Sequence, residues 1–530
     1  MKIPGKYICL VIVLCGLIFG FHKYDRQKSE AKDDPGIPEK LEPEPLDKEA
    51  TSTGERVLVH QKPWLNEDGE KQKKCKDNWQ QKTELRFNDF LINCPIDVEA
   101  KIYANNKIIR TNAETFGTEN SIIAKVAIVV SIGGNKKSDL TTENGERVFD
   151  SIEKLKGIEL AQRDFLNGIS VGGKKIFLEV LIVDDSYNDT FKEKDRAERA
   201  AKYLIDREDV IAVIGHSSSN SIQAAAKYYD NELVAFSATS TAIRTKKSLS
   251  GNVEEFQLNP YIFRTAPNDK FAVEALIDVI KNINRDIQQK PLKTAVILHD
   301  NSSIFSSKYK EEFEKQFLKE IEGSQIIPTD KENNCEYSNY DPINTHEYCV
   351  NFIKNNNPDL LLLIPSFGRA LEIAKPVLED IDRLQLKPQL LGADTMFNNI
   401  FSTEGIAENM IVAVPTKTRT IKGVELSWRG MMTYDAAQAI FQAISETECD
   451  LGSQQQDDDS DRCLRKQIQE VLSGKDFKAP GILGSESVFF EDGDRQIDEG
   501  MAKELGKPQQ VIKTEDGKHK FELYIKGKNN

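Results

Sequence analysis

Two short stretches of this 530-residue chain are dense in side-chain hydroxyl groups, which proteins commonly offer to small anions. The hydroxyl residues are Ser217, Ser218 and Ser219 in the first stretch and Thr239, Ser240 and Thr241 in the second. The first stretch runs directly into a predicted helix, 222–230, whose leading N–H groups are unpaired and carry partial positive charge. Hydroxyl and N–H groups placed together in this way favour binding of a carboxylate or another anion. For one residue, such as Ser219 or Ser221, the alternative is a helix cap, but a cap does not explain the whole cluster.

One carboxylate, Asp394, follows a short apolar segment at 389–393 that has the character of a strand. A buried ammonium group is costly unless a carboxylate meets it, so an acid at this position would complete a site for a zwitterion. The alternative is that Asp394 caps the turn after its strand through nearby backbone N–H groups. Ser366 adds a further hydroxyl directly after the apolar segment 359–365.

These groups need elements that bring them together, and from Ala124 onward the sequence alternates strand and helix patterns. Apolar runs typical of parallel strands buried on both faces occur at 124–132, 175–184, 210–215, 233–237, 294–300, 359–365, 389–393 and 410–415. Helical patterns occur at 151–167, 191–206, 221–230, 270–284, 306–322, 346–355, 369–383 and 434–447. This alternation predicts an α/β fold with two doubly wound parallel-sheet lobes joined by a hinge. Ligands of such sheets bind beyond the carboxyl ends of the strands, where the hydroxyl clusters and Asp394 lie.

No motif of a catalytic, cofactor or metal site competes with this interpretation. The loop His216–Ser221 lacks the Gly-x-Ser-x-Gly pattern of a nucleophile elbow. The chain has neither a Gly-x-Gly-x-x-Gly after the first strand nor a Walker A loop. The acidic run 457–461 resembles the start of a calcium loop, but Arg462 stands where glycine is required and Ile468 where glutamate is required. The sequence therefore predicts no enzyme activity, no cofactor and no metal.

The charge balance of the chain is acidic. The sequence has 71 Lys and Arg against 85 Asp and Glu, which gives a formal net charge of −14. Because binding to nucleic acid requires a clustered basic surface, this balance argues against DNA or RNA as a partner. Hydrophobic residues make up 39% of the chain, and its length allows several domains with large buried cores.

The N-terminus carries one apolar stretch, Tyr7–Phe21, preceded by Lys2 and Lys6. A short apolar core behind a positive start is typical of a secretory signal, and it is also just long enough to remain as a single membrane anchor. The positive charges place the N-terminus inside and the bulk of the chain outside. We expect an extracytoplasmic (periplasmic) protein tethered to the inner (plasma) membrane. Its N-terminal parts are a signal or anchor at 1–23, a flexible spacer rich in Pro and Glu at 24–60 and a small helical hairpin at 61–120.

Six cysteines outside the apolar stretch form three pairs that are close in sequence. The pairs are Cys75 with Cys94, Cys335 with Cys349, and Cys449 with Cys463. An even set of closely spaced cysteines in an exported protein predicts disulfides, the first of which would staple the N-terminal hairpin. The alternative is six free thiols in a cytosolic protein, which the N-terminal stretch disfavours.

From residue 125 to about residue 525 the sequence resembles the type I periplasmic binding proteins, most of all the leucine/isoleucine/valine-binding subfamily of ABC transporters. The segments that carry the resemblance are KVAIVVSI at 125–132, KGIELA at 156–161, DDS at 184–186, VIGHSSS at 213–219, AAAKYY at 224–229, FSATS at 236–240, FRT at 263–265, GAD at 392–394 and TYDAA at 433–437. Their order and spacing together are more specific than any one of them. The resemblance implies two lobes that close on a ligand, with 121–266 and 416–478 in the first and 267–415 and 479–526 in the second. The added N-terminal segment is similar to that of membrane-tethered binding proteins of the cyanobacterial type.

The resemblance also implies roles by position. In the family, the loop matching Ser217–Ser219 holds the α-carboxylate of the ligand, and the loop matching Thr239–Thr241 holds both the carboxylate and the ammonium. The acid matching Asp394 pairs with the ammonium. An aromatic residue, usually tyrosine, lies across from these groups; its counterpart here is Phe305, with Ile304 as a one-residue alternative.

The sequence departs from the family pattern at three places. The usual proline before the Ser-Ala-Thr loop is missing, phenylalanine replaces the tyrosine, and the second-lobe loop reads PSFG at 365–368. The side-chain pocket therefore differs from that of the best-known members. Two functions remain open. The first is the solute-binding component of an ABC importer, which delivers an amino acid or similar small zwitterion to a membrane permease. The second is a ligand-sensing receptor ectodomain of the same fold that acts on another membrane protein.

Overall fold

The computed structural model describes most of the chain from residue 95 onward. The described residues are 95–117, 119–131, 143–185, 193–244, 256–286, 290–327, 336–337, 342–366, 370–397, 406–449, 458–498, 501, 505–514 and 519–524. The predicted signal or anchor, the spacer and the first half of the helical hairpin lie outside these ranges. Within the ranges, no helix combines the length and the hydropathy that a membrane span requires.

The first sheet joins eight strands of the described chain in the order β17-β18-β6-β5-β4-β1-β3-β2. Their bounds are β1 Ser121–Val130, β2 Ile169–Val171, β3 Lys174–Asp184, β4 Val210–Ile214, β5 Val234–Ser237, β6 Ile262–Arg264, β17 Phe490–Glu491 and β18 Asp494–Arg495. The central strands are parallel, and only the two outermost pairs, β17 with β18 and β2 with β3, are antiparallel. Every residue of β4 and β5 is buried, which explains their continuous apolar sequences.

The second sheet is also mostly parallel, in the order β20-β19-β12-β11-β10-β7-β8, with β9 paired to β7. Its strands are β7 Thr294–Asp300, β8 Gln325–Ile326, β9 Glu336–Tyr337, β10 Leu360–Ile364, β11 Gln389–Gly392, β12 Ile411–Thr416, β19 Leu505–Lys513 and β20 His519–Leu523. Strands β19 and β20 pair antiparallel with β12 and with each other. Two separate hairpins are β13 Arg419–Ile421 with β14 Val424–Leu426, and β15 Ala479–Gly481 with β16 Gly484–Val488. The predicted α/β architecture with two parallel sheets is confirmed.

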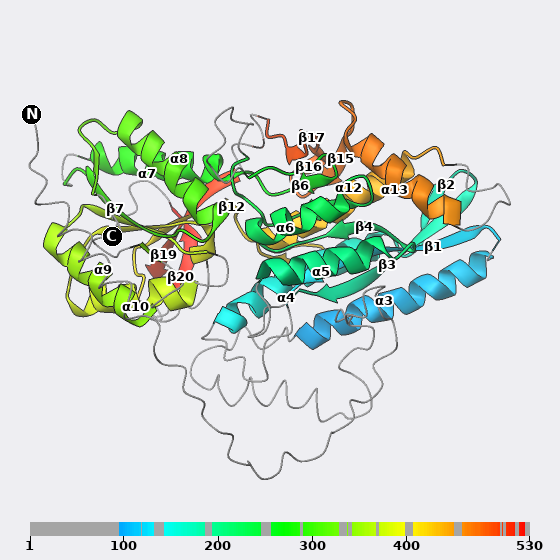
Figure 1. Ribbon diagram of the computed structural model, residues 1–530, viewed down its shortest axis with the longest axis horizontal. Coiled ribbons are helices and arrows are strands. Elements are labelled where there is room, and N and C mark those ends of the chain that lie inside the picture. The colour runs from blue at the N-terminus through cyan, green and yellow to red at the C-terminus, as the bar shows by residue number, and fades with distance from the viewer. Residues whose placement is uncertain are drawn as a thin grey trace, which may run out of the picture. The chain divides into compact units, whose positions relative to one another are not determined.

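Helices cover both faces of each sheet (Figure 1). They are α3 Pro95–Phe116, α4 Glu143–Asp164, α5 Glu193–Ile205, α6 Ser219–Tyr229, α7 Asp269–Asn284, α8 Ile304–Glu320, α9 Pro342–Asn356, α10 Ala370–Arg383, η1 Asp394–Met396, α12 Trp428–Ser445 and α13 Asp458–Leu472. Alternate residues of β1 point to opposite faces: Val126 and Ile128 pack with α4 and α12, whereas Ala127 and Val129 pack with α5 and α6. In the second sheet, α9 and α10 cover one face and α7 and α8 the other.

Over its described residues, the chain crosses between the two sheets three times. It leaves the first sheet after β6 to form α7, returns after β12 to form α12, and leaves again between β18 and β19. The first crossing lies between β6, which ends at Arg264, and α7, which begins at Asp269; the second lies between β12, which ends at Thr416, and α12, which begins at Trp428. The third crossing lies later than the predicted boundary at residue 479, because β18 pairs with β6 in the first sheet and Arg264 forms an ion pair with Asp494 at 2.6 Å.

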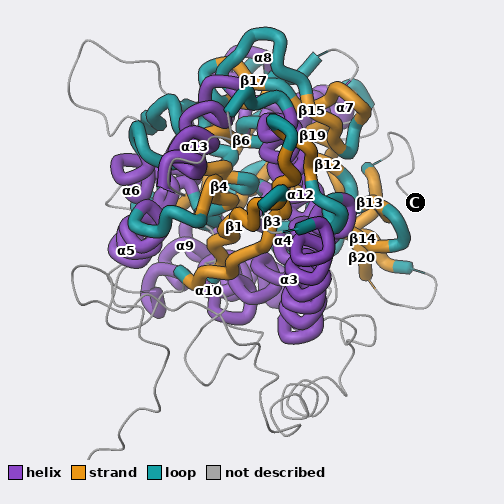
Figure 2. The backbone as a smooth tube through the Cα atoms, turned by 90° about the vertical axis from the view of Figure 1, so that its right-hand side faces the viewer, coloured by secondary structure: helices purple, strands orange, loops and turns teal. Residues whose placement is uncertain are grey.

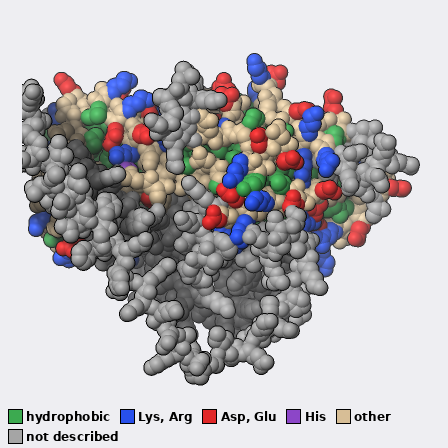
Figure 3. All heavy atoms as spheres, in the orientation of Figure 1, with side chains coloured by type: hydrophobic (Ala, Val, Ile, Leu, Met, Phe, Trp, Pro, Cys, Tyr) green, Lys and Arg blue, Asp and Glu red, His purple; other side chains and the backbone are tan. Residues whose placement is uncertain are grey.

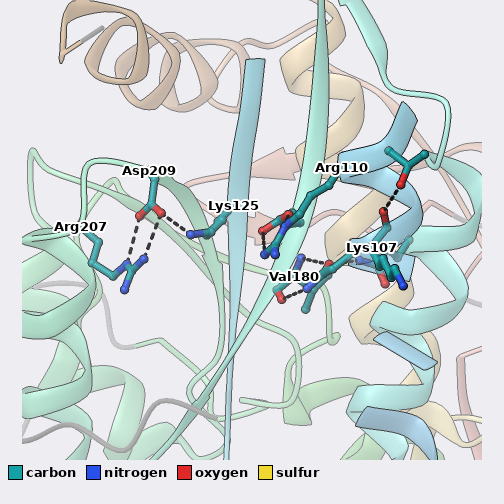
Figure 4. Close-up of polar contacts among 10 residues, drawn as sticks. Lys107, Arg110, Lys125, Val180, Arg207 and Asp209 are labelled. Carbon is teal, nitrogen blue, oxygen red and sulfur yellow. Dashed lines mark hydrogen bonds and ion pairs between the residues drawn. The ribbon is translucent and has the colours of Figure 1, made fainter. Parts of the chain in front are cut away.

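Helix α3 is the part of the predicted hairpin that the structure describes, and it packs on the first lobe beside β3 and α4 (Figure 2). Strand β2 pairs only with residues 174–176 of β3, so the rest of that edge is left for α3. The side chain of Asn106 donates to the carbonyl of Val180 and accepts from its N–H, both at 2.9 Å, in place of a neighbouring strand (Figure 4). Beside it, Arg110 pairs with Glu179. The helix therefore covers a sheet edge, which sequence reasoning did not anticipate.

The predicted cysteine pairs are only partly within the described residues. The Cα atoms of Cys449 and Cys463 lie 6.0 Å apart and their sulfur atoms are bonded. Cys349 is buried in α9, but Cys335, Cys75 and Cys94 lie outside the described ranges. The wider disulfide pattern stays a prediction.

The described surface mixes charges of both signs (Figure 3). Helical neighbours supply many of the close pairs, such as Lys315 with Glu312 at 3.1 Å and Arg383 with Asp380 at 2.7 Å. Exposed pairs of this kind add little stability, so these charges serve mainly to solvate the surface.

Candidate functional site

One pocket collects groups from the carboxyl ends of strands in both sheets and from the start of α12. The residues that line it are Ser217, Ser218, Ser219, Asn220, Thr239, Thr241, Ser303, Phe305, Ser366, Asp394, Thr395, Trp428 and Arg429. All but one of the residues predicted as ligand-binding are therefore brought together. The exception is Ser240, which is buried and shares a hydrogen bond with the Ser219 hydroxyl at 2.8 Å.

The first half of the pocket is the N-terminus of α6. Ser218 is the N-cap residue, and its hydroxyl accepts the N–H of Ser221 at 3.0 Å. The cap is therefore Ser218, which also lines the pocket, and not Ser219 or Ser221, which lie within the first turn of the helix. The next two N–H groups of the helix, those of Ser219 and Asn220, have no acceptor among the hydrogen bonds of the described chain. These N–H groups and the helix dipole make the half favourable for an anion.

Ser217 carries the hydroxyl best placed to donate into the pocket. Lys154, almost fully buried in α4, donates to the Ser217 oxygen. Because an ammonium only donates, the hydroxyl hydrogen of Ser217 stays available for an acceptor. Thr239 is different, since its hydroxyl already donates to the carbonyl of Ser217 at 2.7 Å. The cluster is thus a mixture of donors for a ligand and bonds that hold the loop.

A buried polar network supports this loop from beneath. His216 bridges Asp185, at 2.8 Å from Nδ1, and the hydroxyl of Tyr229, at 3.1 Å from Nε2. Ser131 donates to the other oxygen of Asp185 at 2.8 Å. Burial alone would raise the pKa of Asp185, but His216, the hydrogen bond from Ser131 and the charge of Lys154 together outweigh burial and hold that pKa below its usual range. An ionised Asp185 therefore anchors the loop between β4 and α6.

The second half of the pocket contains buried acids. Asp394 is only 4% exposed, and burial raises its pKa to about 7 against the opposing charge of Arg429. Asp269, at the start of α7, has its pKa raised well above the usual range by burial and by the nearby charge of Asp394. Thr241 hydrogen-bonds to these carboxyl groups. The N–H of Thr395 also bonds to Asp394, as the turn-capping alternative predicts, so Asp394 both holds its turn and lines the pocket.

The remaining predicted residues lie in the second lobe. Phe305, rather than Ile304, lines the pocket, with its ring 5.9 Å from that of Tyr309. Ser366 lines it as well, although its hydroxyl donates to Asp300 at 2.5 Å. Asn220 of α6 connects the lobes directly, because its side chain donates to the carbonyl of Ser302 at 3.1 Å and accepts the N–H of Ile304 at 3.0 Å.

Sequence reasoning missed Trp428 and Arg429, which open α12. Both are almost fully buried, and both line the pocket. Arg429 forms an ion pair with Asp150 at 3.0 Å through Nε and donates to the carbonyl of Asp394 at 3.4 Å through Nη2. They follow the hairpin of β13 and β14 rather than a parallel strand, so the rule that ligands bind at the carboxyl ends of parallel strands does not point to them. A tryptophan beside an arginine at the start of an apolar helix was the signal available.

The similarities to solved structures agree with this geometry. No protein-family model matches the sequence, and no curated protein is similar to it. The isoleucine complex of the branched-chain amino acid binding protein LivJ from Streptococcus pneumoniae covers 76% of this chain and 99% of its own, at 15% identity and a TM-score of 0.51. This chain has the fold of the type I periplasmic binding proteins.

Other proteins of this fold are equally similar. A solute-binding protein of an ABC transporter from Rhodopseudomonas palustris, solved with 3,4-dihydroxybenzoic acid, covers 76% of this chain and 96% of its own, at 16% identity and a TM-score of 0.51. An ABC transporter substrate-binding protein from Sphaerobacter thermophilus covers 76% and 97%, at 13% identity and the same TM-score. The similarity therefore extends across the type I periplasmic binding fold and identifies no ligand.

Proposed function

We propose that this protein is an extracytoplasmic solute-binding protein of an ABC importer and that it binds an amino acid or a similar small zwitterion. The observation that carries the proposal is the division of one pocket into an end with anion-binding donors and an end with a buried acid, Asp394. The similarity to substrate-binding proteins of ABC transporters, one of them solved with isoleucine, supports it.

At the first end, the ligand carboxylate takes the groups that the protein leaves unused. These are the N–H groups of Ser219 and Asn220 and the hydroxyl hydrogen of Ser217. The buried charge of Lys154 behind Ser217 strengthens the attraction for an anion. Hydrogen bonds of charged groups contribute about 1.5–3 kcal/mol each, so a few of them suffice for tight binding.

At the second end, the ligand ammonium meets Asp394. A pKa near 7, reached despite the nearby charge of Arg429, means that the carboxyl group holds its proton easily when no ligand ammonium faces it. An ammonium group favours the ionised form and repays the cost of burying it. Asn220, which already bonds to the other lobe, would close the pocket over a ligand bound between the two ends.

The proposed setting is the outer side of the plasma membrane, with the N-terminal segment as signal or anchor and a membrane permease as the partner. The bonded pair Cys449 and Cys463 fits an oxidising compartment. We extend this to all three predicted pairs. Alkylation with and without reductant, read by mass spectrometry, should therefore find no free thiol outside the apolar stretch.

Calorimetric titration of the full chain with the common amino acids tests the function. We expect saturable binding of at least one of them, with a dissociation constant below about 10 μM. Small-angle scattering of the same samples should show a smaller radius of gyration with ligand, because both lobes contact it. Absence of binding by every amino acid at neutral and mildly alkaline pH would refute the proposal.

A further inference from the structure

Two buried hydrogen-bond donors that line the pocket have no partner in the described chain. They are Nε1 of Trp428, whose residue is 2% exposed, and Nη1 of Arg429, whose residue is 3% exposed. They are neighbours at the start of α12 and are separate from the α6 donors that the proposed function assigns to the ligand carboxylate. A buried donor without an acceptor is costly, so a site that contains two of them is built for a ligand that supplies an acceptor.

The charge of Arg429 is already balanced. Its Nε lies 3.0 Å from Asp150, both side chains are 3% exposed, and its Nη2 donates to the backbone carbonyl of Asp394. The group left over is therefore a hydrogen-bond donor rather than an unpaired positive charge. A second carboxylate on the ligand would place an extra negative charge close to Asp150 and Asp394, with no cation to balance it.

An aliphatic side chain fits these two donors no better. It would fill the space but leave both N–H groups buried and unpaired, and sites built for hydrogen bonds reject such analogues strongly. A neutral oxygen meets both requirements, since it accepts hydrogen bonds and adds no charge. Thr395 also lines the pocket, and its hydroxyl donates to the carbonyl of Pro365 at 3.0 Å, so its oxygen can still accept an amide N–H.

We propose that the ligand is an amino acid with an uncharged side-chain carbonyl, of the glutamine and asparagine type, whose oxygen accepts hydrogen bonds from Trp428 and Arg429. The proposal rests on the proposed function, because it takes the α-carboxylate and ammonium to be held as described above. The proposed specificity differs from that of a pocket that selects amino acids with branched aliphatic side chains.

The test is calorimetric titration of the full chain with glutamine, asparagine, glutamate and leucine at pH 8. These ligands share the amino acid core and differ only in the side chain. We expect glutamine or asparagine to bind at least 100-fold more tightly than leucine and glutamate. Tighter binding of leucine or glutamate overturns the inference and leaves the proposed function intact, whereas no binding by any amino acid refutes both.

Trp428→Phe sharpens the test, because it removes the N–H donor and keeps an aromatic ring. We expect about 10-fold weaker binding of the preferred amide ligand and unchanged or tighter binding of leucine. Tyr309→Phe is the matched control: it removes a buried hydroxyl that has no hydrogen-bond partner among the described residues, and Tyr309 does not line the pocket. It should leave the ratio of amide to leucine affinity unchanged. Equal losses for both ligands in Trp428→Phe would overturn the inference.

Discussion

The two halves of the pocket are built from different chemistry. The half at the N-terminus of α6 uses N–H groups and hydroxyls, held in place by Ser218 and by the network around His216. The half that faces it uses buried ionisable groups, namely Asp394, Asp269 and the pair of Arg429 with Asp150. Fixed dipoles keep their sign at every pH, whereas a buried acid changes its charge near neutrality. The contribution of the first half to ligand affinity should therefore be independent of pH, whereas that of the second half should depend on whether its acid is ionised.

The largest expected effect is on binding by Asp394→Asn. The variant keeps the shape of the side chain and removes the charge that meets the ligand ammonium, so affinity for the best amino acid should fall about 100- to 1,000-fold. Asp278→Asn, at an exposed site on α7, is the matched control and should bind like the wild type. Calorimetric titration measures both. Equal affinities of Asp394→Asn and wild type would remove the ammonium role.

The second-largest expected effect is the pH dependence of binding, which should distinguish the two halves of the pocket. Because the pKa of Asp394 is about 7 without ligand and the ammonium requires the ionised form, affinity should rise with pH up to about pH 8. Between pH 8 and pH 5 the dissociation constant should increase about 100-fold, with one proton released on binding near pH 6. Titrations in buffers of different ionisation enthalpy count that proton. Affinity that is constant from pH 5 to pH 8 would show that Asp394 does not titrate in the site.

The same shift predicts the stability of the empty protein. An acid whose pKa is raised on folding binds more protons in the native state, so stability is lost as pH rises from the unfolded pKa, near 4, through the folded value near 7. Asp394→Asn should therefore stabilise the ligand-free protein at pH 8 by on the order of 4 kcal/mol and should have little effect at pH 4. Melting curves at the two pH values test this. A variant that is less stable than wild type at pH 8 would contradict it.

The smallest effect should come from the first half. Ser217→Ala removes one of several donors to the ligand carboxylate, so affinity should fall about 10-fold. The ratio of mutant to wild-type dissociation constants should be the same at pH 6 and pH 8, because no titrating group is lost. Ser445→Ala, at the exposed end of α12, serves as control. A ratio that changes strongly with pH would show that binding at the α6 half depends on the buried acids, and would contradict the proposed difference between the two halves.

The sequence predicted the fold well for strands whose burial can be recognised from their own residues alone. The apolar runs that became β1, β4, β7 and β10 need no partner to be recognised, because both faces of each strand are covered. It failed for β6, a three-residue strand whose buried Arg264 pairs with Asp494, 230 residues away. Pairings over such distances leave no local pattern.

The residues of the candidate site also fall into a group that local sequence predicts and a group that depends on distant parts of the chain. Residues at the ends of parallel strands or at the start of α6, such as Ser217, Thr241 and Asp394, were predicted from their position in the β/α alternation. Trp428 and Arg429 were missed because a return from the second sheet to the first brings them to the pocket. Lys154 was missed because it acts through Ser217 from within α4.

The central claim is that one pocket recognises both charges of a small zwitterion, one with each half. Titration of the full chain with the best-bound amino acid, its methyl ester and its N-acetyl derivative tests this most directly. The account predicts that the free amino acid binds and that each blocked form binds at least 100-fold more weakly, because each loses the group that one half recognises. Binding of either blocked form with the affinity of the free amino acid would contradict it.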